Sequence, residues 1–205
     1  HNILSYSTNA AISNCKFKGD YVGERATGTR ITNSKLIGEN AFRDSLDIVV
    51  EGSETSASFG RKSRSLVYKN SVSKGKHSLS HIKHLKVINS ELKEHASLCS
   101  SSDIMAFSPY IYCVRNPRSG IIVAGRITYV DMNPDIFDPP DVKIFAVGVD
   151  SIKKYKGFDR PEIVKINQSD IDGEWTSDNL EERMAHICRK HGVEHPRFGQ
   201  LAAAD

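Results

Sequence analysis

Apolar and polar positions along the first two-thirds of the chain repeat every 18 or 19 residues, a longer period than a single helix or strand produces. The segment Ile12-Ser-Asn-Cys-Lys-Phe17 returns four times in degenerate form. The first residues of the five copies are Ile12, Ile31, Val50, Tyr68 and Val87. Ala106-Phe-Ser-Pro109 fits a further, more degenerate copy. A fixed period of about 20 residues is typical of solenoids, in which one coil stacks on the next.

The columns of this repeat predict bent β-strands. The first column is apolar and mostly β-branched, as inward strand positions are. The third column tolerates left-handed or bent backbone, and stacked amides can hydrogen-bond from coil to coil. The fourth column holds small residues that suit a tight corner. The third column is Asn14, Asn33, Gly52, Asn70 and Asn89, and the fourth is Cys15, Ser34, Ser53, Ser71 and Ser90.

A helical interpretation of the repeat fails, because its apolar residues do not follow the 3.6-residue period and Gly, Ser and Asn recur throughout. We therefore expect an all-β protein. Its main part, residues 1–132, would be a single-stranded right-handed parallel β-helix with 18–19-residue coils.

A proline- and aspartate-rich break at residues 133–140 indicates a boundary. Beyond it, residues 142–149 and 162–166 have the apolar pattern of strands. We expect residues 133–205 to form a small α+β appendage that caps the open end of the solenoid, since solenoids need their last coil protected. An independent ligand-binding or partner-binding domain is the alternative.

Helix signals gather near the end of the chain. Asp178 can cap a helix, Glu181 can complete a capping box, and Gly192 supplies a stop. The apolar residues between them share one helical face and should pack on the rest of the protein. They are Leu180, Met184, Ile187 and Cys188.

The segment from Ile111 to Ala124 carries a resemblance to a known family. Its pattern V-x-N-P-x-S-G-x-I-x-A is formed by Val114, Asn116, Pro117, Ser119, Gly120, Ile122 and Ala124. With the Asn-Cys/Ser turns of the coils, roughly residues 3–130 resemble an uncharacterised bacterial family of short-coil right-handed β-helix (pectin-lyase-like) proteins, a domain of unknown function. The resemblance implies the fold and that this segment ends the solenoid. It brings no assigned chemistry, and residues 131–205 differ from the family's short ending.

Composition narrows the class of protein. The four cysteines, Cys15, Cys99, Cys113 and Cys188, show no CxxC pair, so free thiols and a cytoplasmic location are expected. No stretch approaches the ~20 apolar residues of a membrane span. Walker, dinucleotide-binding, nucleophile-elbow and HExxH motifs are absent, and we expect no cofactor.

Charge is unevenly distributed along the chain. Residues 1–130 carry 18 Lys and Arg against 10 Asp and Glu, whereas residues 131–205 carry 10 against 15. Basic residues concentrate between residues 60 and 94, and stacking of coils about 4.8 Å apart would gather them on one surface. Such a surface attracts polyanions, although it could also be a solvated face that prevents association. The candidate anion-binding residues are Arg61, Lys62, Arg64, Lys74, Lys76, Lys83 and Lys86.

Other charged residues should stack across coils. Glu24, Arg43 and Lys62 fall in one repeat column and could form an alternating ladder. Asp20 and Glu39 share another column, and a close carboxylate pair could serve acid–base catalysis. The simpler alternative is two exposed corner residues that splay apart in water.

Two sets of residues have spacings that a metal ion could use, although we expect no metal site. In the set Cys188, His191 and His195, a helix end could instead hold the histidines by its dipole. In the set His77, His81 and His84, side chains of a β-coil would alternate between faces.

The sequence leaves two functions open. We expect a non-enzymatic solenoid scaffold or binding protein whose basic lateral face meets a protein or a polyanion, either polysaccharide or nucleic acid, with homo-oligomers possible. The alternative is a carbohydrate-active enzyme, a polysaccharide lyase or glycosidase of β-helix type. Short coils leave little loop material for a catalytic groove, which favours the first.

Overall fold

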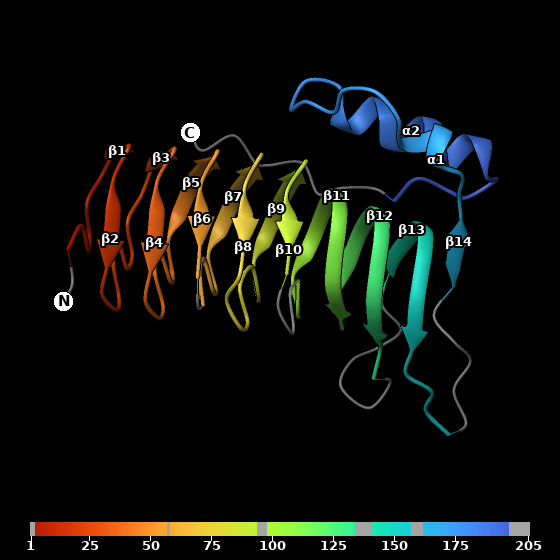
Figure 1. The fold of residues 1–205 in the computed structure, drawn as a ribbon, viewed down its shortest axis with the longest axis horizontal. Helices are drawn as coiled ribbons and strands as arrows, with labels where there is room; N and C mark the ends of the chain where they lie inside the picture. The colour runs from red at the N-terminus through yellow and green to blue at the C-terminus, as the bar shows by residue number, and fades with distance from the viewer. Residues whose placement is uncertain (1–2, 57, 94–97, 134–140, 157–161, 197–205) are drawn as a thin grey trace.

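The protein is a parallel β-solenoid of about seven turns of about 19 residues, with a few helical residues at its C-terminal end. This architecture comes from a computed structural model that describes residues 3–56, 58–93, 98–133, 141–156 and 162–196 (Figure 1). It confirms the expected fold class.

Each of the first coils contributes one strand to each of two sides of the stack. The first side consists of β1 (Ala11–Ser13), β3 (Arg30–Thr32), β5 (Leu46–Glu51), β7 (Arg64–Lys69) and β9 (Lys83–Ile88). The second consists of β2 (Lys16–Lys18), β4 (Lys35–Ile37), β6 (Glu54–Thr55), β8 (Val72–Ser73) and β10 (Glu91–Leu92). β11 (Ser102–Arg115) is long enough to pair with both β9 and β10. Three further strands follow it: β12 (Ser119–Asp131), β13 (Asp141–Ile152) and β14 (Ile163–Lys165).

The strand register confirms the first repeat column. Ile12 pairs with Ile31, and each later member of the column pairs with the next as far as Ala106. The five members of this column, the first of which is Ile12 and the last Val87, are all buried. The degenerate copy at Ala106 is therefore a genuine coil.

The third column makes the bend between the two sides of each coil. Its five residues all have positive φ, between 46° at Asn33 and 58° at Gly52. This is the left-handed backbone that Asn and Gly tolerate best, so the column's composition has a backbone cause.

The coil-to-coil side-chain hydrogen bonds expected from the asparagine amides come instead from the fourth column. The Ser53 hydroxyl accepts a hydrogen bond from the Ser34 backbone N–H at 3.0 Å and donates to the Glu51 carbonyl at 2.8 Å. The same pair of bonds recurs at Ser34, Ser71 and Ser90. A row of serine hydroxyls thus satisfies buried backbone groups at each corner.

Replacing Ser53 by alanine should lower the free energy of unfolding by about 1–3 kcal/mol, because the buried N–H of Ser34 loses its acceptor. Urea unfolding monitored by circular dichroism measures the change. Ser13→Ala serves as the control, since Ser13 is exposed. Equal effects of the two substitutions would contradict a structural role for the serine row.

The ladder continues past residue 132. β13 pairs in parallel with β12, and β14 with β13, so the predicted strands at 142–149 and 162–166 extend the sheet. The turn at Asn116–Gly120, expected to end the solenoid, connects β11 to β12 inside it. The reason is that the inward apolar column continues through Ile122 and Ile144. Residues 134–140 of the predicted break lie outside the described part, and the division into 1–132 and 133–205 stays a prediction.

Two helices follow, α1 (Gln168–Ile171) and α2 (Leu180–Lys190). The predicted helix is α2, and Leu180, Met184, Ile187 and Cys188 are its buried residues, as expected. The helix begins at Leu180 and its N-cap is Asn179, so the predicted cap Asp178 is wrong by one residue. Gly192 follows its end with φ of 67°.

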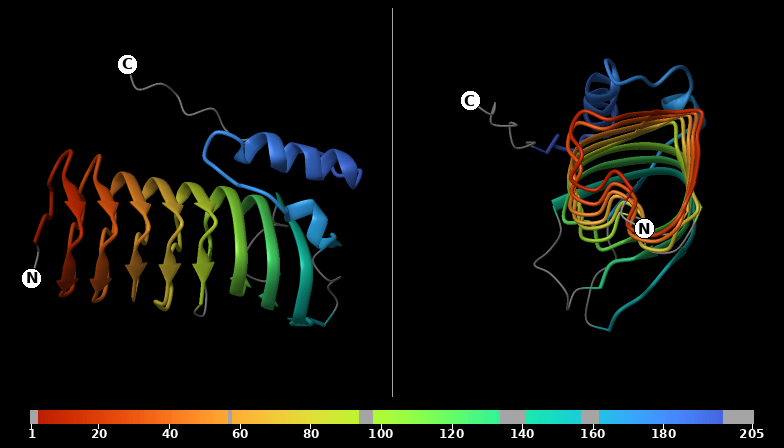
Figure 2. Two further views of the ribbon diagram at one scale, coloured as in Figure 1. Left: turned by 45° about the horizontal axis from the view of Figure 1, so that its top comes forward. Right: turned by 90° about the vertical axis from the view of Figure 1, so that its left-hand side faces the viewer.

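The helices lie along the side of the last coils and not over the open end, where we expected the appendage (Figure 2). They cover outward-facing apolar side chains of the strands from β9 to β13, which form a second core with them. The strand residues of this core are Ile88, Phe107, Ile121, Val123 and Phe145. Water cannot solvate such a row favourably, so the helices bury it.

Candidate anion-binding corner

Four cations gather along one corner of the stack, where the chain enters the strands of the first side. Arg61 and Lys62 lie just before β7, Arg64 is its first residue, and Lys83 is the first residue of β9. Arg64 and Lys83 are direct neighbours in the parallel ladder, in which strands lie about 4.8 Å apart. We call these four residues the basic corner.

The charges of the basic corner are not neutralised by any neighbour that the structure describes. None of its residues forms an ion pair within the described part of the chain. Lysines elsewhere are paired: Lys74 Nζ lies 2.8 Å from Glu54 Oε2, and Lys69 Nζ lies 3.0 Å from Glu51 Oε1. Adjacent like charges disfavour the folded state, and the field they create attracts anions.

The other predicted anion-binding residues lie elsewhere. Lys74 and Lys76 are exposed beyond the end of β8, and Lys74 is paired with Glu54. Lys86 is half-buried in β9, between Val67 and Met105 on the outer surface of the first side. The structure thus brings four of the seven predicted residues together and separates three.

His81 lies beside the basic corner. It stacks on Lys62, because the Lys62 N–H donates to the carbonyl of Ser80 in the next coil at 3.0 Å. Partial burial, and then the charges of Arg61, Arg118, Lys62 and His77, hold the pKa of His81 below its usual range. The imidazole is therefore mostly neutral at neutral pH.

Arg118 is a residue of this region that the sequence pattern did not indicate, because it lies outside the basic segment 60–94. The Arg118 N–H donates to the Ser101 carbonyl at 2.8 Å, which places it two coils after His81. The step from β11 to β12 is 16 residues and not 18 or 19, so Arg118 falls in the column of Arg64, Lys83 and Ser102, where counting in coil periods would not have placed it.

The predicted ladder of Glu24, Arg43 and Lys62 is shifted by one residue at its last member. Arg25 N–H donates to the Arg43 carbonyl, and Asp44 N–H donates to the Arg61 carbonyl. Arg61 therefore occupies the column of Glu24 and Arg43, because one coil of the repeat is 18 residues long. Arg43 pairs with its own neighbour Asp44, with Nε 3.1 Å from Oδ2.

Asp20 and Glu39 lie at one corner of the first coils, where the carboxylate of Asp20 makes a contact to backbone. Both residues are exposed, and Asp20 Oδ1 accepts a hydrogen bond from the backbone N–H of Glu39 at 2.8 Å. Asp20 thus closes a corner between two coils.

Neither histidine set converges on a metal position, since no three His, Cys, Asp or Glu side chains among the described residues are grouped to hold an ion. His84 Nδ1 instead lies 3.1 Å from Asp103 Oδ2. His191 Nε2 lies 3.5 Å from Asp170 Oδ2, while Cys188 is buried on the inner face of α2. His195 takes part in no such group either.

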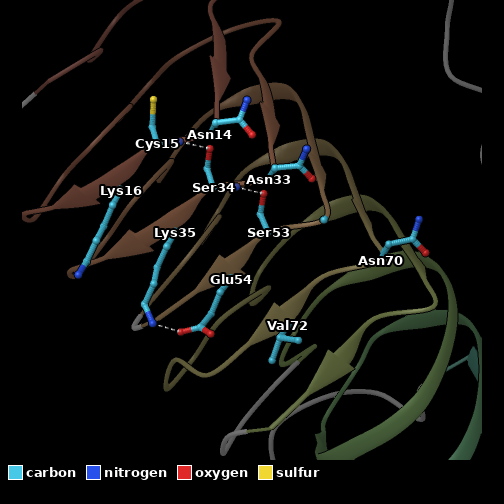
Figure 3. A pocket seen from close by; sticks show the side chains of 11 residues that line it. Asn14, Cys15, Lys16, Asn33, Ser34, Lys35, Ser53, Glu54, Asn70 and Val72 are labelled. Atoms are coloured by element: carbon cyan, nitrogen blue, oxygen red, sulfur yellow. Dashed lines mark hydrogen bonds and ion pairs between the residues drawn. The ribbon is translucent and has the colours of Figure 1, made fainter.

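A shallow groove of about 560 Å³ runs along the bend between the two sides of the first coils (Figure 3). The amides of Asn14, Asn33 and Asn70 line one edge, and the side chains of Lys35 and Glu54 lie toward the other. Lys35 Nζ lies 2.6 Å from Glu54 Oε1, so the charges offset each other. Hydrogen bonds from two lysines lower the pKa of Glu54, which suits a structural ion pair and not a proton donor.

Comparison with known proteins gives one match. The model of a family described as "Protein of unknown function (DUF3737)" matches residues 2–145, which extends into β13. No curated protein matches the chain, and no solved structure does. Among the described residues, no helix has the length and apolar character that crossing a membrane takes.

Proposed function

Since this chain belongs to the DUF3737 family, which has no assigned activity, we propose its function from the charges of the solenoid: it is a non-enzymatic scaffold that binds a linear polyanion at the basic corner. The observation that carries the proposal is the set of four unpaired cations in adjacent coils. Arg61, Lys62, Arg64 and Lys83 lie close together without ion pairs among the described residues, whereas Lys69 and Lys74 are neutralised.

The rigid stack keeps these cations at fixed separations. Neighbouring coils are joined by backbone hydrogen bonds, such as that from Lys83 N–H to the Ser63 carbonyl at 3.2 Å. A repeating anionic polymer can therefore meet several cations at once and release its counterions. Each arginine can also bind a sulfate, carboxylate or phosphate group by donating two hydrogen bonds to it.

Recognition by charge fits an acidic polysaccharide better than a nucleic acid. Single strands are usually held by aromatic rings on which the bases stack. The basic corner contains none, and Tyr68 of β7, the strand that begins at Arg64, points into the core and is fully buried. Heparin, a sulfated polysaccharide, is therefore the probe of choice.

Replacing Lys62 and Lys83 together by glutamine should weaken binding of heparin about ten-fold or more at moderate salt, because two of four unpaired cations are lost. Affinity is measured by fluorescence anisotropy of labelled heparin. The same measurement with labelled single-stranded DNA tests the preference for polysaccharide.

Lys16 and Lys18 offer a matched control, since they are exposed lysines of the first coil without ion pairs among the described residues. The Lys16→Gln/Lys18→Gln variant has the same net charge as the test variant and should bind like the wild type. Equal losses in both variants would mean that net charge alone drives binding, which would refute the basic corner. No binding by the wild type at low salt would refute the proposal entirely.

A further inference from the structure

The region around His81 is more specific than an array of surface charges. Three residues approach it from two neighbouring coils: Lys62 stacks on it directly, Arg61 precedes Lys62, and His77 comes from its own coil. The positive charge of Arg118, which lies in a later coil, also lowers the pKa of His81. Among the described residues, the charged and titratable groups that lower the pKa of His81 are three cations and one imidazole.

Arg61 differs from the other members of the basic corner in its burial. Its side chain is only partly exposed, whereas Lys62, Arg64 and Lys83 are exposed. Its Nε atom is buried and has no hydrogen-bond partner in the part of the chain that the structure describes. Leaving a charged donor unsatisfied costs free energy, which an anionic acceptor would recover.

We propose that Arg61, Lys62 and His81, with Arg118 beside them, form a subsite for one tetrahedral oxyanion, a sulfate or phosphate group of the bound polymer. This inference rests on the proposed function and refines it. Arg61 and Lys62 supply the permanent charge, and the imidazole supplies a donor once it is protonated.

The histidine gives the subsite a pH dependence. In the free protein, partial burial and then the positive charges of its neighbours disfavour the imidazolium, which is why the pKa of His81 is lowered. A bound dianion reverses that effect and favours the imidazolium. Binding should therefore take up a proton, and affinity should rise as the pH falls through the range in which His81 titrates.

The test uses sulfate as the probe, because sulfate keeps its charge over the range in which histidine titrates. The titration midpoint of His81 is measured by proton NMR of its ring between about pH 5 and 8, in sodium sulfate and in sodium chloride of equal ionic strength. The His81 signal is identified by its disappearance in His81→Asn, which keeps a residue tolerant of the positive φ of 58° at this position. We expect sulfate to raise the midpoint by about half a pH unit or more.

Arg61→Gln should abolish this rise, whereas Arg30→Gln, on the first side of the stack, should leave it intact. Identical His81 midpoints in the two salts would overturn the subsite. If heparin still binds at the basic corner in that case, the proposed function survives without the subsite. If sulfate shifts His81 but heparin does not bind, the subsite is supported and the proposed polymer binding is refuted.

Discussion

Replacing Phe59 by alanine is expected to lower the free energy of unfolding by about 3–5 kcal/mol. Phe59 is fully buried, and its ring lies between those of Phe42 and Tyr68, with centroids 5.7 and 6.1 Å away. The three rings form a continuous row of contacts inside the solenoid. Phe42 also packs against Gly23, where an added Cβ would meet its ring at 2.4 Å, so moving this ring into the cavity would cost that contact.

Urea unfolding monitored by circular dichroism measures this loss. Phe17→Ala is the matched control, since Phe17 is only half-buried in the first coil and should cost clearly less. Phe59→Leu keeps most of the volume and should fall between wild type and Phe59→Ala. A Phe59→Ala protein as stable as Phe17→Ala would show that the aromatic stack does not hold the coils together.

Replacing Met184 by aspartate should detach α1 and α2 from the side of the solenoid. Met184 is fully buried between α2 and the outward row of the strands, and a carboxylate there has no partner to offset its desolvation. We expect a loss of about 4 kcal/mol or more in the free energy that holds the helices in place. The newly exposed apolar row should also promote aggregation.

Trp175 reports this detachment directly, because it is the only tryptophan of the chain. Its ring stacks on that of Phe107, with the ring centroids 4.1 Å apart, and its indole N–H donates to the Ile171 carbonyl at 2.9 Å. Undocking should therefore shift its fluorescence emission to longer wavelength in Met184→Asp. His186→Asp adds the same carboxylate to an exposed position of α2 and should leave the emission unchanged. An unshifted emission in Met184→Asp would contradict the packing described for the helices.

The repeat was sufficient to predict the register of the coils. Side chains of one column must meet the same environment in every coil, so the spacing alone aligns Ile12, Ile31 and Val50, and the ladder pairs them. The bend at the asparagines followed from their tolerance of positive φ. The slip of one residue at Lys62 could not be predicted in the same way, because side chains on a corner carry no alternation to fix their register.

The position of the helices could not be derived from the repeat. It depends on the outward column of the first side, which changes from Glu51 and Lys69 to Ile88 and Phe107 along the stack. A signal existed in β12, where residues 121–124 are apolar without alternation, as in strands buried on both faces. The predicted amphipathic helix could have been matched to that second face.

The basic corner was only partly predictable. A window along the sequence counted Lys74 and Lys86 with Arg61 and Lys83, because all lie within one short segment. Which cations are neutralised depends on residues in other coils, such as Glu54 for Lys74. Arg118 was missed for the same reason, since it approaches His81 from later coils.

The salt dependence of heparin binding tests the central claim most directly, that unpaired cations at one corner of the stack bind a polyanion. Affinity is measured over a range of sodium chloride concentrations for wild type, Lys62→Gln/Lys83→Gln and Lys16→Gln/Lys18→Gln. Each lost contact should reduce the slope of log affinity against log salt by about one unit, so the corner variant should lose about two units. The first-coil variant should keep the wild-type slope. A wild-type slope in the corner variant would contradict the claim, because Lys62 and Lys83 would then make no contact with the polymer.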